Sequence, residues 1–375
     1  MSANDISPEE LEDLRTTVRD ILAQHCDDAA VRAAIGSEAG FDRSLWQLLA
    51  NEVGLHALAM PEVYGGDGFG LSELGVVLGE MGAAVMPGPF LTSVVIAGGA
   101  LLMSDDSAAL TAHLPGIADG STIATLAVIE SDGAWRTDGF TVVADEASDG
   151  WVLSGEKSLV PDGNTAHLIL VAATTPTGPS LFAVDAGAAG LARTPLRTLD
   201  LTRPMSRLTF DRTPAILVGT SGDAPRILSA VLDRATAALA AEQVGAARAC
   251  LEMSVAYAKE REQFGRKIGS FQAVKHKLAD MFTRVTLADA AATEALRAAD
   301  GRDDAPPASV AAAVAHSVCS DAFMYVAAET IQVHGGIGFT WEHPAHLFFR
   351  RAKADQLMFG GPGVYHERLL NRLGV

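Results

Sequence analysis

The chain has 375 residues, and 49% of them are hydrophobic, which is enough for large packed cores and roughly two to three domains. Its formal net charge of −18 argues against nucleic-acid binding and against an anionic membrane surface, because both need clustered Lys and Arg. A phosphate-bearing cofactor stays possible, since a few local arginines can bind it.

The cysteines and the N-terminus bear on the cellular compartment. Cys26, Cys250 and Cys319 lie far apart without metal-ligand spacing, so neither a disulfide framework nor a zinc site is expected. The first twenty residues are acidic and polar, unlike a secretory signal. The apolar stretch 91–103 is too short and too rich in small residues to span a bilayer. We expect a soluble, cytoplasmic protein without a membrane span.

Residues 1–118 have a helical pattern. Ser7, followed by Pro8 and two glutamates, predicts the start of a helix with apolar residues at helical spacing. A second amphipathic helix is expected at "RSLWQLLANEVGL", before a glycine-rich connector, "MPEVYGGDGFG", at 60–70. These features predict an N-terminal α-helical domain.

Residues 119–220 have a strand-like sequence pattern, unlike the helical pattern before and after them. Short β-branched runs such as "GWVLSGEKSLV" and "AHLILVAATT" are separated by Gly, Asp, Asn and Pro about every ten residues, as in a small antiparallel barrel or sandwich. Residues 221–375 are again helical, with expected segments at 223–262, 271–300, 305–333 and 344–372. The predicted fold class is therefore α+β: N-terminal helices, a middle β domain and a C-terminal four-helix bundle.

Two stretches of the C-terminal region suggest a phosphate ligand. "HGGIGFT" at 334–340 follows a helical run rather than a strand, so it lacks the context of a dinucleotide-binding fingerprint, and alone it indicates a helix end. In "AYAKEREQFGRKIGSFQ", Arg261, Arg266 and Lys267 cluster with Phe264 and Phe271 at a helix corner. Such a corner can bind a pyrophosphate and adenine, or be only a basic solvated surface.

Together these stretches resemble the acyl-CoA dehydrogenase family over almost the whole chain. The resemblance rests on "PEVYGGDGFG", "SGEKSLVPDG", "YAKEREQFGRKIGSFQAVKHKLADM" and "IQVHGGIGFTWEHP", which occur in the family's order. It implies the three-part fold described above and FAD bound between subunits. It also implies a set of residues that contact the pyrophosphate and adenine half of a neighbour's FAD: Arg261, Gln263, Phe264, Gln272, Gln332, Gly335, Gly336 and Gly338.

The resemblance fails where the family places its catalytic carboxylate. The family reaction removes an α-proton from an acyl thioester while a hydride leaves to the flavin, and it needs a carboxylate base. One family position for that base corresponds to Phe359 and the other to Ala235, which is followed by Thr236. Neither can accept a proton. Asp355, about one helical turn before Phe359, is the candidate for a relocated base, although helix caps and surface pairs are the simpler interpretation of such carboxylates.

The β domain departs from the family in the groups that the resemblance assigns to the flavin ring. Ile129 and Ser131 replace a Thr and a Pro, and Leu159 and Pro161 replace a Trp and a Thr. The ring half of the site is therefore altered, while the half offered to a neighbouring subunit is retained. For the histidines near these segments, His276, His316, His334 and His343, we expect structural roles and no metal site.

These observations support three hypotheses. The first is the base-lacking partner subunit of a heteromeric acyl-CoA dehydrogenase, like those of actinobacterial steroid catabolism, in which an unlike, base-bearing chain completes a heterotetramer. The second is a homo-oligomeric FAD enzyme with a relocated base, and the third is a non-catalytic scaffold that binds CoA esters without flavin. The first two imply an acyl-CoA substrate and an electron-transfer flavoprotein as partner. Missing carboxylates disfavour the second, and the retained FAD contacts disfavour the third.

Overall fold

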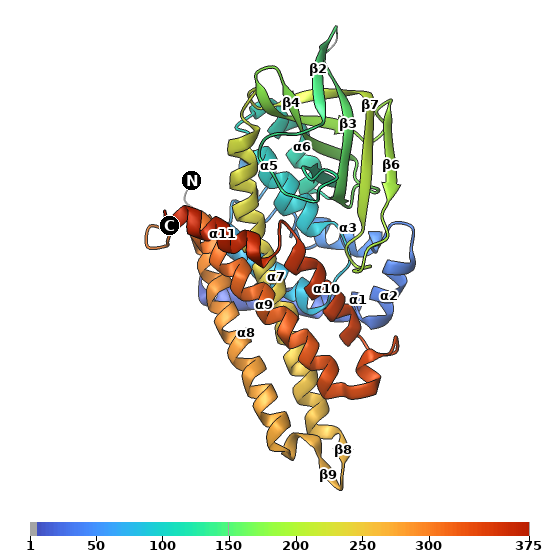
Figure 1. The fold of residues 1–375 in the computed structure, drawn as a ribbon, viewed down its shortest axis with the longest axis vertical. Helices are drawn as coiled ribbons and strands as arrows, with labels where there is room; N and C mark the ends of the chain where they lie inside the picture. Colours follow the sequence, from blue (N-terminus) through green and yellow to red (C-terminus); the bar gives the residue numbers. More distant parts are fainter. Residues whose placement is uncertain (1–5, 149, 375) are drawn as a thin grey trace. The chain divides into compact units, whose positions relative to one another are not determined.

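The computed structural model describes residues 6–148 and 150–374, and its ribbon is drawn in Figure 1. By compactness the chain divides into two units. One contains residues 34–70 and 87–235, and the other contains residues 6–33, 71–86 and 236–374. Each is described separately below. The three-domain division at 118 and 220 stays a prediction.

The N-terminal region is helical, as expected. Its helices are α1 (Pro8–His25), α2 (Asp28–Gly36), α3 (Arg43–Asn51), η1 (Glu62–Tyr64), α4 (Leu71–Ala83), η2 (Leu91–Ala97), α5 (Gly98–Met103) and α6 (Ser107–Ala118). The first helix begins with the predicted cap. Ser7 Oγ accepts from the Glu10 N–H at 3.2 Å, and Glu10 Oε2 accepts from the Ser7 N–H at 2.7 Å, which forms a capping box.

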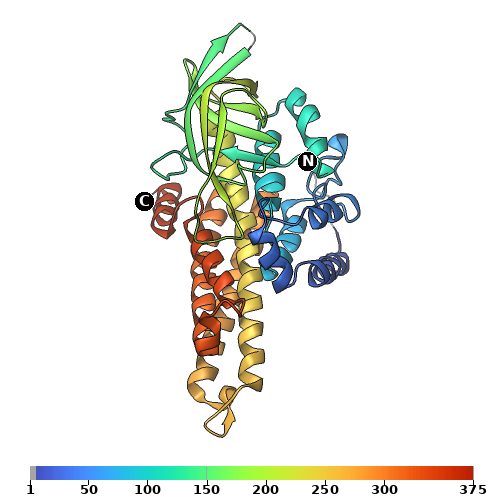
Figure 2. The same cartoon turned by 90° about the vertical axis from the view of Figure 1, so that its right-hand side faces the viewer.

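Among the described residues, seven strands follow and form the middle β region. They are β1 (Ala124–Ala127), β2 (Val143–Ala147), β3 (Gly150–Pro161), β4 (Leu168–Thr175), β5 (Gly178–Asp185), β6 (Leu191–Pro195) and β7 (Met205–Val218). The pairings β2–β3, β3–β7, β7–β5 and β5–β4 are antiparallel, and a single parallel pair joins β4 back to β2. These five strands therefore close on themselves as a small barrel (Figure 2).

The remaining two strands complete the sheet beside the barrel. β1 pairs in parallel with β4, and β6 pairs with β7. Burial explains β4: seven of its eight residues are buried, as the near-continuous apolar run "LILVAATT" requires. The parallel pairs are a difference from the purely antiparallel sheet that the sequence suggested.

The C-terminal region is a helical bundle. It contains α7 (Ala224–Glu260), the strands β8 (Glu262–Gln263) and β9 (Arg266–Lys267), η3 (Ile268–Ser270), α8 (Gln272–Ala299), α9 (Ala308–His334), η4 (Gly335–Phe339), α10 (Ala345–Leu357) and α11 (Pro362–Leu373). In Figure 1, α8 and α9 run side by side, and α10 and α11 pack on α9. The long helix α7 contributes residues to both units.

The last expected helix, 344–372, is in fact two helices. α10 ends at Leu357, and α11 begins at Pro362. Between them Phe359 has φ +63° and Gly360 has φ +115°, which no helix can contain. Pro362 then restarts the helix at its first position, where its missing N–H costs nothing.

Glycines let α4 pack closely on α7 within the second unit. A Cβ at Gly245 would lie 1.8 Å from the Gly79 carbonyl oxygen, and one at Gly82 would lie 2.0 Å from the Glu242 carbonyl oxygen. Beside this contact, Glu242 forms a buried ion pair with Arg351 of α10. Glu242 therefore links α7 to α10 within the bundle.

One helix among the described residues, Ala308–Phe339, is long and apolar enough to cross a membrane by length and composition. Of its apolar window, 61% is buried inside the chain, which is the burial of a bundle core helix. Alone it is weak evidence for a membrane span.

Candidate functional site

The basic corner between α7 and α8 is a tight hairpin. Strands β8 and β9 are joined by Phe264 and Gly265, with φ values of +55° and +76°. Two positive φ values in a two-residue loop are the geometry that matches the twist of a hairpin. Phe264 at the tip is 91% exposed, and its ring meets Phe271 edge-on with centroids 6.2 Å apart. Arg266 stacks on the other aromatic ring, with its Cζ 3.9 Å from the Phe271 centroid.

The polar residues predicted to contact a neighbour's cofactor lie exposed at this corner. Arg261 directly follows α7, and its backbone N–H donates to the Tyr257 carbonyl at 2.8 Å. Gln263 lies in β8 opposite Arg266, and Gln272 is the first residue of α8. The hairpin thus brings Arg261, Gln263 and Gln272 to one end of the bundle, where all three are exposed.

The glycine loop ends α9 and then turns its backbone outward. Gly335 has φ +63° and caps the helix, as its N–H donates to the Ile331 carbonyl. A Cβ at Gly335 or Gly336 would meet nothing within 4 Å, so the backbone there is open to a ligand. Gly338 differs, because a Cβ there would lie 2.9 Å from the His334 Cβ. Gly338 is therefore required for packing, whereas this chain leaves space beside Gly335 and Gly336. Gln332, also predicted to line the cofactor, is exposed in the last turn of α9.

A stack of rings joins the glycine loop to the hairpin corner. His334 stacks on Tyr257 of α7 with centroids 4.4 Å apart and planes 28° apart, and His343 lies 4.4 Å from His334. The His334 ring nitrogen Nδ1 pairs with the Thr330 carbonyl at 2.8 Å. Burial lowers the pKa of His334, which favours the neutral ring. Tyr257 lies one turn before Arg261, so this stack brings the glycine loop close to the hairpin corner. The contacts of His334 and His343 are packing contacts, which is the structural role expected for them.

Phe359, where the sequence predicts the first family base position, is buried within this chain. It is 3% exposed, and its carbonyl accepts from Arg368 Nη1 of α11 at 3.0 Å. Burial and the neighbouring Arg368 lower the pKa of His316 to about 4, so this ring behind α11 stays neutral at pH 7. Asp355, the candidate for a relocated base, is 0% exposed in α10 and so presents no accessible surface to a ligand.

Thr236, next to the second base position, is occupied by contacts of the same chain. Ala235 is 0% exposed and Thr236 1%. The Thr236 hydroxyl shares a 2.7 Å hydrogen bond with the Tyr365 hydroxyl of α11. Tyr365 in turn stacks on His316 with centroids 3.7 Å apart and planes 21° apart. Sequence reasoning missed Tyr365. The helix face on which Tyr365 lies depends on the break between α10 and α11, which the sequence analysis did not predict.

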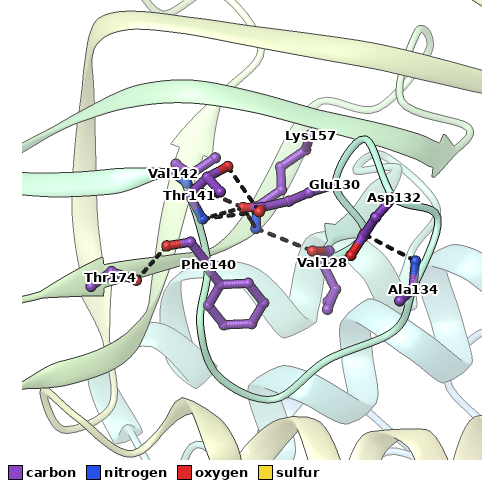
Figure 3. A network of polar contacts seen from close by, with 9 residues as sticks. All are labelled: Val128, Glu130, Asp132, Ala134, Phe140, Thr141, Val142, Lys157 and Thr174. Atoms are coloured by element: carbon purple, nitrogen blue, oxygen red, sulfur yellow. Dashed lines mark hydrogen bonds and ion pairs between the residues drawn. The ribbon is translucent and has the colours of Figure 1, made fainter.

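In the barrel, a buried lysine organises the loop between β1 and β2 (Figure 3). Lys157 is 0% exposed, and its Nζ donates to Glu130 Oε1 at 2.9 Å and to the Val128 carbonyl at 3.1 Å. The same Nζ lies 4.1 Å from the Phe140 ring centroid. Burial lowers the pKa of Lys157 to about 8, although Glu130 opposes the shift.

Glu130 holds the far side of that loop. Its carboxylate accepts from the backbone N–H groups of Thr141 and Val142 at 2.9 and 3.1 Å, and from the Thr141 hydroxyl at 2.8 Å. The sequence pointed to this segment through Ile129 and Leu159 but missed Glu130 as its organiser. Leu159, for which the resemblance implies a Trp in the family, is 40% exposed with φ +49°. The arrangement fixes a loop, and neither Ile129 nor Leu159 has a side-chain donor.

Among the described residues, no group of three or more His, Cys, Asp or Glu side chains is placed to hold a metal ion.

Comparison with known proteins identifies the class. A model of the acyl-CoA dehydrogenase N-terminal domain matches residues 8–121, and a model of the acyl-CoA dehydrogenase C-terminal domain matches residues 225–373. The chain belongs to the acyl-CoA dehydrogenase family of flavoprotein oxidoreductases, whose members serve lipid and steroid catabolism.

Individual relatives match over nearly their full length. "Acyl-CoA dehydrogenase IpdE2" of Mycobacterium tuberculosis is 37% identical over 366 residues, which is 96% of each chain. Among solved structures, "Tcur3481-Tcur3483 steroid ACAD G363A variant" is 36% identical with a TM-score of 0.88 over 98% of each chain. The ChsE4-ChsE5 complex from Mycobacterium tuberculosis is 32% identical with a TM-score of 0.87 over 98% of each chain.

Proposed function

We propose that this chain is the base-lacking subunit of a heteromeric acyl-CoA dehydrogenase and completes the FAD site of an unlike, base-bearing chain. One contrast carries the proposal. The positions where the family keeps its base are closed by the chain's own side chains, whereas the residues that would serve a neighbour's cofactor are exposed.

The closed positions argue against chemistry on this chain alone. Abstraction of an α-proton needs a carboxylate within hydrogen-bond reach of the substrate. Phe359 has no such group, and Tyr365 holds Thr236 in a buried hydrogen bond. The nearby Asp355 is fully buried. A relocated base would require this part of the bundle to open.

The exposed surface fits the anionic half of FAD. Arg261 can bind a pyrophosphate through two parallel hydrogen bonds, and the open backbone at Gly335 and Gly336 allows an approach that a Cβ would block. Gln263 and Gln272 supply polar edges for the adenine. FAD, when bound, accepts the hydride that leaves the substrate. In the barrel, Ile129 and Leu159 stand where the family has hydrogen-bonding and covering groups, so that half fits the flavin ring poorly.

The substrate class follows from the relatives. The structure of the Tcur3481-Tcur3483 protein is named a steroid enzyme, and ChsE4-ChsE5 is named a complex. We assign the assembly the α,β-desaturation of a bulky, steroid-derived acyl-CoA, with an electron-transfer flavoprotein as electron acceptor and the cytoplasm as location.

The test is the visible absorbance of the protein purified alone and after co-expression with a base-bearing paralogue. We expect no flavin in the first preparation and about one FAD per unlike pair in the second. Arg261→Ala in this chain should lower flavin retention of the pair. The control is Arg284→Ala, which removes another exposed arginine, in α8, and should leave flavin retention unchanged.

Other outcomes would select another function. A full flavin content in the chain alone, bleached by an acyl-CoA, would overturn the proposal in favour of a homo-oligomeric enzyme, and Asp355→Asn would then test its base. Flavin absent from both preparations, together with binding of a CoA ester, would indicate a scaffold protein.

A further inference from the structure

Three histidines bracket the glycine loop and lie together in the fold. His334 is the last residue of α9, His343 precedes α10 by two positions, and His346 is the second residue of α10. His334 and His346 are 4% and 8% exposed, and His343 is half-buried. We call these three residues the histidine cluster. The glycine loop runs between them, so both of its ends are held by rings whose charge can change with pH.

The ring of His343 caps α10 and can do so only while it is neutral. Its Nδ1 accepts a hydrogen bond from the Ala345 N–H at 3.2 Å, so its Nε2 carries the proton of the neutral ring. A protonated ring has a hydrogen on both nitrogens and cannot accept this bond. The centroid of His343 also lies 4.4 Å from that of His334, which is stacked on Tyr257. Charges on both histidines would therefore place two cations next to each other in a partly buried site.

The surroundings of the cluster oppose its protonation. Burial is the main cause that lowers the pKa of each member. For His343 the neighbouring rings and Arg32 of α2 add to this effect, and for His346 Arg32 and Arg350 of α10 do. Asp28 of α2 raises the pKa of both, but its carboxylate also accepts a hydrogen bond from Arg32 Nε at 2.8 Å. The folded chain therefore favours the neutral form of all three rings.

We propose that the histidine cluster is a proton-sensitive latch, which holds the glycine loop in place while its rings are neutral and releases the loop when they take up protons. Proton uptake at His343 breaks the bond to Ala345 and places a cation beside His334. Opening of residues 335–344 relieves the repulsion, because it exposes the rings to water. Such local opening costs less than unfolding of the chain, since η4 within this segment is a 3-10 helix of only five residues.

The direction of the pH effect follows from the direction of the pKa shifts. In the open segment the rings titrate near the ordinary pKa of 6.5, and in the closed segment they titrate below it. The closed state is therefore fully favoured above pH 6.5 and loses its advantage as the pH falls below 6.5 toward the lower folded values. Each proton taken up on opening can change the opening equilibrium by up to about tenfold per pH unit.

The latch goes beyond the proposed function, because it concerns the chain's own loop and can be measured without flavin. If the proposed function also holds, mildly acidic pH loosens Gly335 and Gly336 and so lowers flavin retention of the complex. The two proposals can fail separately. Flavin content tests the proposed function, and opening of the loop in the flavin-free chain tests the latch.

The experiment is hydrogen–deuterium exchange of the full chain, read by mass spectrometry at pH 7.5 and pH 5.5. Exchange rates are converted to protection factors, which removes the intrinsic effect of pH on exchange. We expect the protection of residues 335–345 to fall at least threefold at pH 5.5, including the Thr340 N–H that donates to the Ile337 carbonyl. The amides of α8 should keep their protection, because this opening is local.

Two variants that cannot be protonated test whether the histidines cause the effect. His334→Phe keeps an aromatic ring against Tyr257, and His343→Asn keeps a side-chain acceptor for the Ala345 N–H. Each should reduce the pH effect, and the double variant should keep the loop closed at pH 5.5. The control is His366→Asn, which removes an exposed histidine of α11 and should leave the pH effect unchanged.

Three results would overturn the latch. The first is protection of residues 335–345 that does not change between pH 7.5 and pH 5.5. The second is an equal loss of protection in α8, which would show that the whole bundle is destabilised. The third is a pH effect that persists in the double variant. If a variant does not fold, which circular dichroism shows, the pH profile of the wild-type chain still decides through the first two results.

Discussion

The buried Lys157–Glu130 pair makes an asymmetric prediction about the stability of the barrel. Glu130→Gln keeps an acceptor for the Thr141 and Val142 backbone but removes the negative charge beside a lysine that is 0% exposed. Leaving a buried charge without its counter-charge costs about 3–5 kcal/mol. Lys157→Met removes the buried cation instead, and Glu130 keeps three donors and is 13% exposed. We expect that change to cost about 1–2 kcal/mol, from the lost hydrogen bonds.

The pH dependence of the two variants follows from the pKa of Lys157, which burial lowers to about 8. Between about pH 8 and the unfolded value of 10.5 the unfolded chain binds more protons than the folded one, so this group makes stability rise with pH in that window. Above pH 8 the folded lysine is neutral and no longer needs the Glu130 charge. The cost of Glu130→Gln should therefore be largest below pH 8 and shrink by pH 10.

Urea denaturation at pH 7 and pH 10, followed by circular dichroism, measures both effects. Thr174→Val is a control, because it removes one hydrogen bond of the same region, to the Phe140 carbonyl, without touching the charges. Equal losses for the two variants, or a cost of Glu130→Gln that does not change with pH, would show that the pair is not a buried charge system and would refute the reasoning.

Three further predictions concern packing and pH. Tyr365→Phe should cost about 1 kcal/mol in urea denaturation, and Thr236→Val should then add little, because the two hydroxyls share one bond. Gly338→Ala should lower the melting temperature, because its Cβ would press on the preceding helix, whereas Gly336→Ala should leave the melting temperature unchanged and lower flavin retention of the complex. Burial lowers the pKa of His56 to about 3, so its contribution to stability is present above pH 6.5 and is lost as the pH falls toward 3; His56→Gln should flatten that part of the stability profile.

Local patterns predicted most of the elements because the information lies within a few residues. Ser7 and Glu10 cap α1 as expected, since a cap depends only on its own turn. The short β-branched runs became strands, and the apolar periodicity of residues 221–334 became α7, α8 and α9. The strand β6, "LARTP", was missed because Thr194 is its one β-branched residue and its strand pairing is with the distant β7.

Features that depend on contacts between distant residues could not be predicted. The closing of the barrel rests on one parallel pair, Val143 with Thr174, which no local signal specifies. The break between α10 and α11 was not predicted, because a helical pattern continues on both sides of the two glycines and the proline at 360–362. The absence of a carboxylate at Ala235 could be derived from the sequence, but the hydrogen bond of the adjacent Thr236 to Tyr365 could not, because that contact joins segments 129 residues apart.

Two phenylalanines of the C-terminal region have positive φ but lie in different environments. A residue with a Cβ in this conformation costs roughly 1–2 kcal/mol. Phe359, with φ +63°, is 3% exposed, and Arg368 holds its carbonyl, so the fold offsets the strain internally. Phe264, with φ +55°, is 91% exposed and contacts Phe271 only edge-on, so little in the chain offsets its strain.

A strained and exposed aromatic residue is explained if its stabilising contacts come from another molecule. Phe264→Asn relieves the strain, because Asn tolerates positive φ, and should change the stability of the isolated chain by less than about 1 kcal/mol. In the complex with a base-bearing chain, the same change should weaken association and flavin retention severalfold. Phe359→Asn should do the opposite and destabilise the isolated chain by several kcal/mol, because it places an amide in a packed core. If Phe264→Asn instead destabilised the chain alone and left the complex intact, the hairpin tip would be a structural element, and the proposed trans contact would lose its exposed anchor.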